Sequence, residues 1–401
     1  MTYQDPRNVS TGGIGKMQAS LSPLYGQYVP NKLKSLYYGS DVVKLHLLSC
    51  LPSETSKAFI ITGTSLATST SLIKDLEELL SPKHHAGTYA GIKAHSPQTQ
   101  IDDATSIISQ DESIDTIISV GGGSPMDSAK NMVYQVREAT GRLLSHITIP
   151  TTLSAGECTP GAGFTKEDGV KGIRFHADLY VSYIFYDPKF ALPTPPTLWL
   201  STGIRALDHA VETQYHPSAT WIPSKMIALN AIAQLFRLLP AYVANPTNED
   251  TITACFLAVY ASLGFFGQNI QGGLGLSHSL GYALGSPYGI GHGYTSCISL
   301  PPVVKLKARE SKQNAASIAA ILPFIGEEQS GDDVADADLV SERITGLIEQ
   351  IGLKTDLTAQ GVSKSEADII AARATRLPFG GETPDEKQLW KSVRELVDTL
   401  W

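Results

Sequence analysis

Residues 116–130 read TIISVGGGSPMDSAK, and this stretch decides how the first part of the chain folds. The run TIISV is apolar and rich in β-branched residues, which favours a buried strand. Gly121, Gly122 and Gly123 follow it, and a helical pattern starts near Met126. Consecutive glycines after a strand let the backbone approach an anion closely, and the N-terminus of the next helix offers unpaired N–H groups. The stretch therefore indicates a diphosphate cradle, although a glycine-rich turn without a ligand would have the same pattern.

The segments on either side of the cradle alternate between short β-rich runs and helix-like runs. KAFIITGT and LIKDLEELL precede it, and MDSAKNMVYQV and HITIPTT follow it. This alternation, from about residue 35 to 200, predicts βαβ units and a parallel sheet. From about residue 201 the pattern changes to long helical periodicities, such as KMIALNAIAQLFRLLPAYV. The predicted fold class is α/β plus all-α, with an N-terminal Rossmann-like domain followed by an all-helical domain.

Prolines mark the boundary between the two predicted domains. The stretch ALPTPPTLWLSTG (191–203) contains three prolines that would stop a continuing helix, and Ser201 or Thr202 could cap the next one. We therefore predict a dinucleotide-binding α/β domain over residues 1–198 and an all-helical substrate and catalytic domain over residues 199–401.

The composition is that of a soluble globular protein. The chain has 401 residues, of which 42% are hydrophobic and 17% charged, so two cores can form. A net charge of −8 without a dense Lys/Arg run argues against nucleic-acid binding. The N-terminus has no charged-then-apolar leader, and no apolar run reaches the length of a membrane span, so we expect a cytoplasmic protein. The four cysteines lie far apart in the sequence, which fits reduced thiols.

Five motifs, in their order and spacing, resemble the iron-containing alcohol dehydrogenase family. They are GGGSPMDSAK, IPTTLSAGECTP (149–160), YDPKFALPTPP (186–196), GIRALDHAVE (203–212) and GLGLSHSLGYALGSPYGIGHG (273–293). The resemblance covers most of the chain. It implies a dehydroquinate-synthase-like two-domain fold, an NAD(P)-dependent dehydrogenase or reductase, a small-molecule substrate and, as is common in this family, a homodimer. AHSP (94–97) and the TPP before the second domain are most similar to the maleylacetate reductase branch.

The resemblance assigns cofactor residues position by position. It implies that the glycine loop and Ser124 hold the pyrophosphate of a nicotinamide dinucleotide. The nicotinamide and its ribose would be lined by Thr151, Thr152 and Leu153. Asp127, in the family's SPxDxAK pattern, would also lie beside the cofactor.

The choice between NAD and NADP depends on the end of the first strand. Many family members place an Asp there, at the ribose hydroxyls, where this chain reads FIITGTSL (59–66) with Gly63. Without a carboxylate, the 2′-phosphate of NADP meets no repulsion, and Thr62, Thr64 and Ser65 could hydrogen-bond it. NADP, or use of both cofactors, is therefore slightly favoured.

The metal-binding pattern of the family is altered. Members with iron or zinc use one Asp and three His, the Asp and the first His being four residues apart on a DAxxHAxE helix. Here that helix reads RALDHAVE, so Arg205 stands at the Asp position and His209 keeps the first His. His278 and His292 match the other two ligands. Tyr282 falls where the metal-binding members keep a further, non-ligand His.

A guanidinium is an unfavourable neighbour for a metal ion. A unit positive charge about 4 Å from a dication costs on the order of 8 kcal/mol at an effective dielectric near 20. Asp208 is expected to point off the ligand face and so not to offset this cost. We therefore predict no metal, with Arg205 as the resident positive charge that polarises a carbonyl or grips a carboxylate. In the alternative, the side chain of Arg205 turns to Glu212 or to solvent, and the three histidines are packed and hydrogen-bonded without a catalytic role.

The predicted function is a metal-independent NAD(P)H-linked oxidoreductase. It would reduce a carbonyl or an activated C=C of a small oxygenated or carboxylated substrate. Tyr282, with its pKa lowered by Arg205 and by charged histidines, is the candidate proton donor, although it could also only shape the site. The three histidines could share that role, and His95 in AHSP is a candidate substrate contact. Two alternatives stay open: a metal-dependent alcohol dehydrogenase with a three-His site, and a non-redox isomerase or cyclase.

Overall fold

The computed structural model describes residues 28–266, 270 and 272–401. Packing divides the chain into two compact units. The sheet unit comprises Lys32–Ala206 and Arg237–Tyr260, and the helical unit joins the described residues of Met1–Asn31 to Leu207–Phe236 and Ala261–Trp401. The packing units interleave along the sequence, so they do not test the predicted boundary at 198/199, which stays a prediction.

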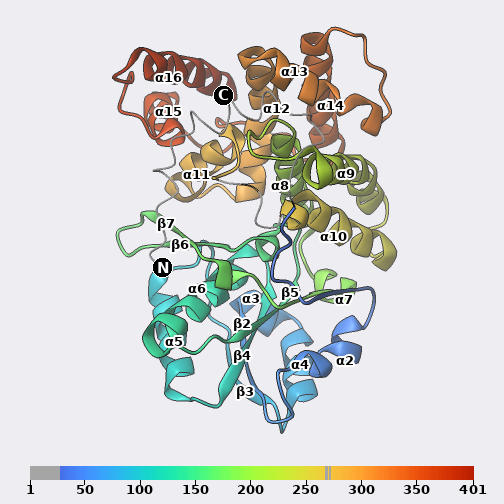
Figure 1. Cartoon of the computed structure of the whole chain (residues 1–401), viewed down its shortest axis with the longest axis vertical. Helices are drawn as coiled ribbons and strands as arrows, with labels where there is room; N and C mark the ends of the chain where they lie inside the picture. Colours follow the sequence, from blue (N-terminus) through green and yellow to red (C-terminus); the bar gives the residue numbers. More distant parts are fainter. Residues whose placement is uncertain (1–27, 267–269, 271) are drawn as a thin grey trace. The chain divides into compact units, whose positions relative to one another are not determined.

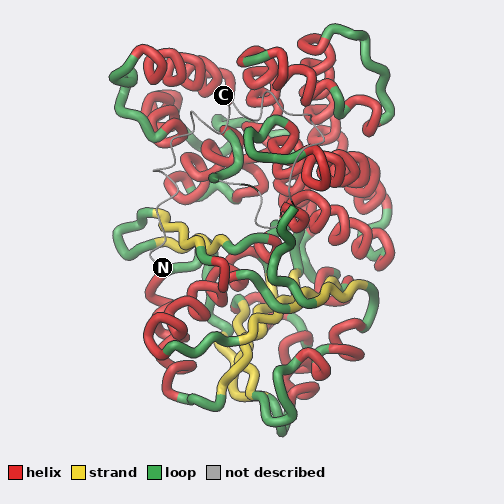
Figure 2. The backbone as a smooth tube through the Cα atoms, in the orientation of Figure 1, coloured by secondary structure: helices red, strands yellow, loops and turns green. Residues whose placement is uncertain are grey.

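A six-stranded, all-parallel sheet forms the centre of the sheet unit (Figure 1; Figure 2). The strand order is β1-β8-β5-β4-β2-β3, with β1 at Ser35–Tyr38, β8 at Tyr183–Tyr186, β5 at Ser145–Pro150, β4 at Ile114–Gly121, β2 at Lys57–Thr62 and β3 at His85–Tyr89. The central strand β4 is buried along almost its whole length, as expected for a β-branched run between two parallel neighbours. The prediction of a parallel sheet built from βαβ units is confirmed.

Helices pack on both faces of this sheet (Figure 1). They are α2 (Val42–His46) and α4 (Leu72–Leu80) on one face, and α5 (Gln98–Gln110) and α6 (Gly123–Thr140) on the other. Side chains of the strands alternate accordingly: Ile60 and Ile118 join the core with α2 and α4, whereas Ile61 and Ile117 join the core with α5 and α6.

The chain leaves β2 and β4 in opposite directions across the sheet. The neighbours β2 and β4 pair in parallel, but β2 continues through α3 (Thr64–Ser69) and α4 to β3, while β4 continues through α6 to β5. The carboxyl ends of β2 and β4 therefore flank a topological switch point, which is where doubly wound sheets bind ligands. The short helix α7 (Pro188–Ala191) and the antiparallel hairpin of β6 (Gly161–Thr165) and β7 (Lys171–Phe175) complete the unit's smaller elements.

Helices dominate the rest of the chain, and within the described ranges no strand follows β8. They are α8 (Pro196–Gln214), α9 (Met226–Ala244), α10 (Glu249–Leu263), α11 (Leu276–Tyr288), α12 (His292–Glu310), α13 (Lys312–Ala319), α14 (Asp333–Gln350), α15 (Ala367–Thr375) and α16 (Pro384–Val397). In the helical unit, Leu280 and Leu284 of α11 share a core with Val393 and Val397 of α16. The predicted fold class, a parallel-sheet domain followed by a helical region, is confirmed.

Helix α8 begins earlier than the sequence predicts. It starts at Pro196, so Ser201 and Thr202 lie inside the helix and do not cap it. Proline is tolerated in the first helical turn because its missing N–H has no partner there. The Thr202 hydroxyl donates to the Leu198 carbonyl at 2.9 Å and accepts the N–H of Leu153 at 3.0 Å. The threonine therefore ties α8 to the segment that the sequence assigns to the nicotinamide.

Two helical stretches are long and apolar enough to cross a membrane by length and composition alone, Trp221–Ala244 and Glu249–Phe266. In their most apolar windows 44% and 50% of the residues are buried inside the protein, and core helices of soluble proteins pass the same test. All four cysteines are buried and free, which confirms the expectation of reduced thiols.

Candidate active site

The glycine loop lies at the switch point, between the end of β4 and the start of α6. Gly121 has φ +140°, and a Cβ there would lie 2.9 Å from Cγ of Pro125. A Cβ on Gly122 would lie 3.1 Å from the Thr152 side chain. The protein itself therefore requires these two glycines. At Gly123 the nearest side-chain atom, Oγ of Ser154, would be an ordinary 3.5 Å away, so packing leaves room for a side chain there. A bare helix N-terminus at this position fits a bound diphosphate.

The predicted nicotinamide segment lies against this loop. The N–H of Thr151 donates to the Gly121 carbonyl at 2.9 Å, and the Thr151 carbonyl accepts the hydroxyl of Thr194 at 2.7 Å. Thr152 faces Gly122, and Leu153 is held by Thr202 of α8 as described above. The structure thus brings all three predicted nicotinamide residues to the cradle, while their contact with the cofactor stays a prediction.

The end of β2 lies beside the end of β4, with Thr62 opposite Val120. Gly63 follows β2 as the N-cap of α3, and a Cβ there would be 3.3 Å from the carbonyl oxygen of Ile92. The hydroxyl of Thr64 donates to the Ala90 carbonyl at 2.9 Å. Gly63 and the three residues after it include no carboxylate, so this strand end presents hydroxyls where an acidic side chain would repel a 2′-phosphate.

Lys130 of α6 supports the loop after the nicotinamide segment. Its buried ammonium donates to the carbonyls of Gly156 and Thr159, both at 2.5 Å, and of Gly161 at 3.0 Å. Burial lowers the pKa of Lys130, and the nearby carboxylates of Asp127 and Glu157 oppose this shift. With all three ammonium protons directed at loop carbonyls, Lys130 positions the loop and does not contact a ligand.

Asp127 and Lys171 meet beside the first turns of α6. The Oδ2 atom of Asp127 and the Cε atom of Lys171 lie 3.2 Å and 3.5 Å from the position that a Cβ of Gly163 would take. Burial raises the pKa of Asp127, while Lys130 and Lys171 lower it. Burial lowers the pKa of Lys171, the charge of Asp127 raises it, and the charge of Arg205 lowers it further. Lys171, which sequence analysis did not single out, therefore shares one electrostatic environment with Asp127 and Arg205.

The AHSP segment is tied to the start of α6 as well. The N–H of His95 donates to Oγ of Ser124 at 3.1 Å, and Oγ of Ser96 donates to the Ser124 carbonyl at 3.0 Å. His95 and Ser96 have φ values of +65° and +50°, a strained conformation for residues other than glycine. The pKa of His95 is lowered by burial and then by the charge of Lys171. His95 thus lies near the cradle, and its contact with substrate stays a prediction.

In the helical unit, the sequence-predicted site residues form two ring pairs. The ring centroids of His209 on α8 and His278 on α11 are 4.8 Å apart. Those of Tyr282 and His292 are 6.1 Å apart with nearly perpendicular planes, at 79°. His209 and His278 are each 5% exposed, whereas Tyr282 is 36% exposed. Arg205, four residues before His209 on α8, belongs to the sheet unit and is 7% exposed.

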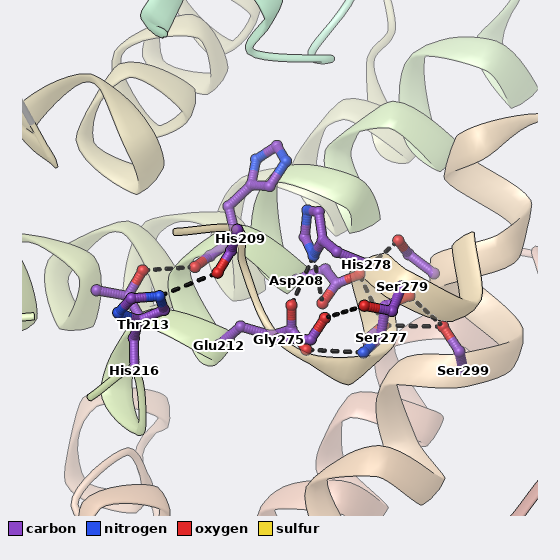
Figure 3. A network of polar contacts seen from close by, with 12 residues as sticks. Asp208, His209, Glu212, Thr213, His216, Gly275, Ser277, His278, Ser279 and Ser299 are labelled. Atoms are coloured by element: carbon purple, nitrogen blue, oxygen red, sulfur yellow. Dashed lines mark hydrogen bonds and ion pairs between the residues drawn. The ribbon is translucent and has the colours of Figure 1, made fainter. Parts of the chain in front are cut away.

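Two buried carboxylates hold His278 from one side of its ring (Figure 3). Nδ1 of His278 lies 2.7 Å from Oε2 of Glu212 and 3.6 Å from Oδ1 of Asp208. Asp208 also accepts the hydroxyls of Ser277 at 2.8 Å and Ser296 at 2.6 Å. Asp208 and Glu212, four residues apart, thus share the helix face that packs against α11. The expectation that Asp208 does not offset the charge of Arg205 stays a prediction.

Hydrogen bonds join the side chains of this cluster, and the ligand atoms of Asp208, Glu212 and His278 lie within 4.8 Å of one another, which is close enough for a metal ion by distance alone. A carboxylate only accepts hydrogen bonds, so the 2.7 Å contact with Glu212 places a proton on Nδ1 of His278, and that nitrogen has no lone pair for a cation. The second oxygen of Glu212 accepts the N–H of Ser277 at 2.8 Å. Both oxygens of Glu212 are thus engaged within the helical unit.

The same contact orients His278 as a metal-binding histidine would be oriented, since ligand histidines usually donate their other N–H to a carboxylate. The resemblance also assigns a carboxylate ligand to the metal, and that position holds Arg205. Asp208 and Glu212 cannot replace that ligand, because both lie on the Nδ1 side of His278. The donor set of imidazoles with a guanidinium one helical turn away therefore fits a dication poorly.

Comparisons with known proteins agree with this fold and with the arrangement of the motifs. Residues 34–188 match the family described as iron-containing alcohol dehydrogenase, and residues 199–396 match the C-terminal domain of the same family. Dehydrogenase FUM7 of Gibberella moniliformis is 31% identical over 366 residues, covering 79% of this chain and 84% of that protein. Maleylacetate reductase 1 of Rhodococcus opacus is 27% identical over 321 residues, covering 78% and 80%.

A solved structure shows the same fold. The crystal structure of maleylacetate reductase from a Rhizobium species superposes with a TM-score of 0.75 at 21% identity, covering 95% of this chain and 99% of that one. The two family matches together span most of the sequence, with the glycine loop in the first and Arg205 and the histidines in the second. The chain therefore belongs to the iron-containing alcohol dehydrogenase family and is an NAD(P)-linked oxidoreductase of the dehydrogenase and reductase class.

Proposed function

We propose that this protein reduces a carbonyl or an activated C=C of a small oxygenated or carboxylated substrate with NAD(P)H and without a metal ion. The observation that carries the proposal is the donor set around His278, whose carboxylates lie on the Nδ1 side of the ring. Arg205 stands at the position that the resemblance assigns to the family's ligand Asp. The names of the maleylacetate reductases among its relatives support a small, carboxylated substrate.

When bound, the reduced nicotinamide supplies the hydride, and the protein supplies orientation, charge and a proton. The bare N-terminus of α6 holds the diphosphate, and the segment of Thr151 to Leu153, fixed by Gly121 and Thr202, limits the position of the nicotinamide ring. Arg205 takes the role of the metal by donating hydrogen bonds to the carbonyl oxygen, where negative charge develops as the hydride arrives at carbon. The proton that completes the alcohol then comes from a side chain of the protein.

Cofactor preference, assembly and location are part of the same proposal. NADP is slightly favoured over NAD because Gly63 and the hydroxyls after it replace the acidic residue that many relatives place at the ribose. We further propose that the protein is cytoplasmic and forms a homodimer. Its substrate is a small molecule.

We expect Tyr282→Phe to lower kcat by about 100-fold, the lower end of the usual contribution of a positioned general acid. Tyr282 is half-exposed beside the ring of His292, so removal of one hydroxyl leaves the packing of α11 unchanged. Single-turnover reduction measured by loss of NAD(P)H absorbance tests this, and fluorescence titration should give unchanged NAD(P)H affinity. An unaltered kcat would show that Tyr282 only shapes the site. The histidines would then be the candidate proton donors.

The experiment that tests the proposed function combines two measurements on one sample purified without chelator. Metal content is measured by mass spectrometry, and binding of NADH and NADPH by fluorescence. We expect bound nucleotide, tighter for NADPH, and first-row metal far below one ion per chain. A stoichiometric metal whose removal abolishes activity would establish a metal-dependent alcohol dehydrogenase. Failure of both nucleotides to bind would favour the non-redox isomerase or cyclase.

A further inference from the structure

The loop that follows the predicted nicotinamide segment forms one side of the diphosphate cradle. It covers residues 154–160 and contains a short 3₁₀-helix, η3 (Gly156–Cys158). Oγ of Ser154 lies 3.5 Å from the position that a Cβ of Gly123 would take, and a Cβ on Gly156 would lie 3.7 Å from the Cα of Gly123. The loop therefore bounds the space at the bare N-terminus of α6, and any shift of the loop changes the room that a diphosphate has there.

A buried carboxylate in the middle of this loop attaches it to the sheet. Glu157 is 1% exposed, and its Oε1 atom accepts the hydroxyl of Tyr186 on β8 at 2.7 Å. The ring of Tyr186 is itself buried and stacks on Phe256 of α10, with centroids 4.7 Å apart and an interplanar angle of 5°. Because strand pairing and this stacking fix the phenol, its hydroxyl is a rigid anchor for the loop.

Lys130 supplies a second anchor on the other side of Glu157. Its ammonium donates to the Gly156 carbonyl at 2.5 Å, and this carbonyl belongs to the peptide group that joins Gly156 to Glu157. Between the cradle and these two anchors lies Ala155, whose φ of +58° is a strained conformation for a residue other than glycine. Such a conformation persists only where surrounding contacts impose it, so the anchors hold the loop in a shape that it would not adopt alone.

Glu157 is costly as a packing residue. Burial raises the pKa of its carboxyl, while the hydrogen bond from Tyr186 and the charge of Lys130 oppose this shift. Its second oxygen, Oε2, is buried and has no hydrogen-bond partner among the residues that the structure describes. An apolar side chain of similar size would fill the same space without the cost of removing a carboxylate from water. The presence of Glu157 therefore indicates a role beyond packing.

We propose that Glu157 and Tyr186 are positioning residues of the cofactor site. Their hydrogen bond fixes the loop of residues 154–160 against the N-terminus of α6, and the loop then leaves the space that the diphosphate needs. Both side chains are buried and act through the loop, so neither contacts the cofactor. This inference rests on the proposed function, which places the diphosphate at α6, and adds two residues to which the family resemblance assigns no role.

The test compares ADP-ribose, which carries the diphosphate, with adenosine, which lacks it, each titrated by calorimetry into the full chain. We expect Tyr186→Phe and Glu157→Met each to weaken ADP-ribose binding about tenfold, the effect of one hydrogen bond to a charged group. The weaker binding of adenosine should not change. The double variant should lose no more than the larger single loss, because both changes break the same hydrogen bond. Glu157→Gln should keep most of the affinity, since its amide oxygen still accepts the hydroxyl of Tyr186.

Tyr183→Phe is the matched control. It removes a hydroxyl from the same strand, on the face of the sheet that packs against α2 and α4, and should leave ADP-ribose binding unchanged. Wild-type affinity for ADP-ribose in both single variants would overturn the proposal. An equal loss for ADP-ribose and adenosine would also overturn it, because the pair would then hold the fold as a whole, and so would additive losses in the double variant.

The wild-type protein separates this proposal from the proposed function. If the wild type bound neither NADPH nor ADP-ribose, the proposed function would be wrong and the positioning role with it. If the wild type bound both and the variants bound them equally well, only the positioning role would be wrong.

Discussion

Replacing Gly123 with valine is expected to weaken the binding of NADH and NADPH at least 100-fold, about 2.8 kcal/mol, while the protein stays folded. Gly123 is the first residue of α6, directly behind the positive-φ Gly121 and the N-cap Gly122. In the protein alone, a Cβ at Gly123 meets only the Ser154 side chain, at 3.5 Å and beyond. A bound diphosphate would need that space, because the N–H groups of a helix terminus bind an anion only at direct contact. The side chain therefore excludes the cofactor without disturbing the loop.

Fluorescence titration of both nucleotides and thermal unfolding measure the two parts of this expectation. Gly123→Ala should give an intermediate loss of affinity. Gly346→Val in α14, where a Cβ meets no neighbouring atom within 4 Å, is the control for the cost of valine in a helix, below about 1 kcal/mol. If Gly123→Val kept full affinity for the nucleotides, the diphosphate would not bind at this loop. A loss of affinity accompanied by unfolding would instead show that Gly123 is required by packing.

Most of the sheet unit is predictable from sequence because its signals are local. The run TIISV is too apolar for anything but a buried strand, and three glycines before a helical pattern leave few conformations for the connection. The start of α8 is not predictable in the same way. Prolines at 193, 195 and 196 indicate the end of one helix and the first turn of another equally well, and the structure uses Pro196 for the second purpose.

The candidate site is only partly predictable, because its electrostatics depend on contacts between distant segments. The spacing within RALDHAVE places Arg205 and His209 one turn apart, but it does not reveal that Asp208 and Glu212 both face His278, some 65 residues later. Lys171 carries no motif of its own in the EDGVKG turn. Its proximity to Asp127 follows from the pairing of β6 with β7 above α6, a non-local arrangement that no periodicity encodes.

Arg205→Asp is expected to create a metal site and to abolish the reaction of the native enzyme. The change removes the guanidinium, which opposes a dication by on the order of 8 kcal/mol at about 4 Å, and supplies a carboxylate at the position that the resemblance assigns to the metal's Asp ligand. His278 is already oriented by Glu212 for ligation through its other nitrogen. We therefore expect about one Zn²⁺ or Fe²⁺ per chain after incubation and dialysis, measured by mass spectrometry, where the wild type retains almost none.

Arg205→Gln is the matched control, since it removes the charge without supplying a carboxylate. It should bind less metal than Arg205→Asp because it lacks the carboxylate ligand, and it should lose reductase activity as completely as Arg205→Asp. The pKa of Lys171 should rise in both variants, since the charge of Arg205 lowers it in the native protein. If Arg205→Asp bound no metal, the histidines would not form a ligand set even without the guanidinium. If Arg205→Gln kept full activity, Arg205 would have no role in the reaction and would not replace the metal.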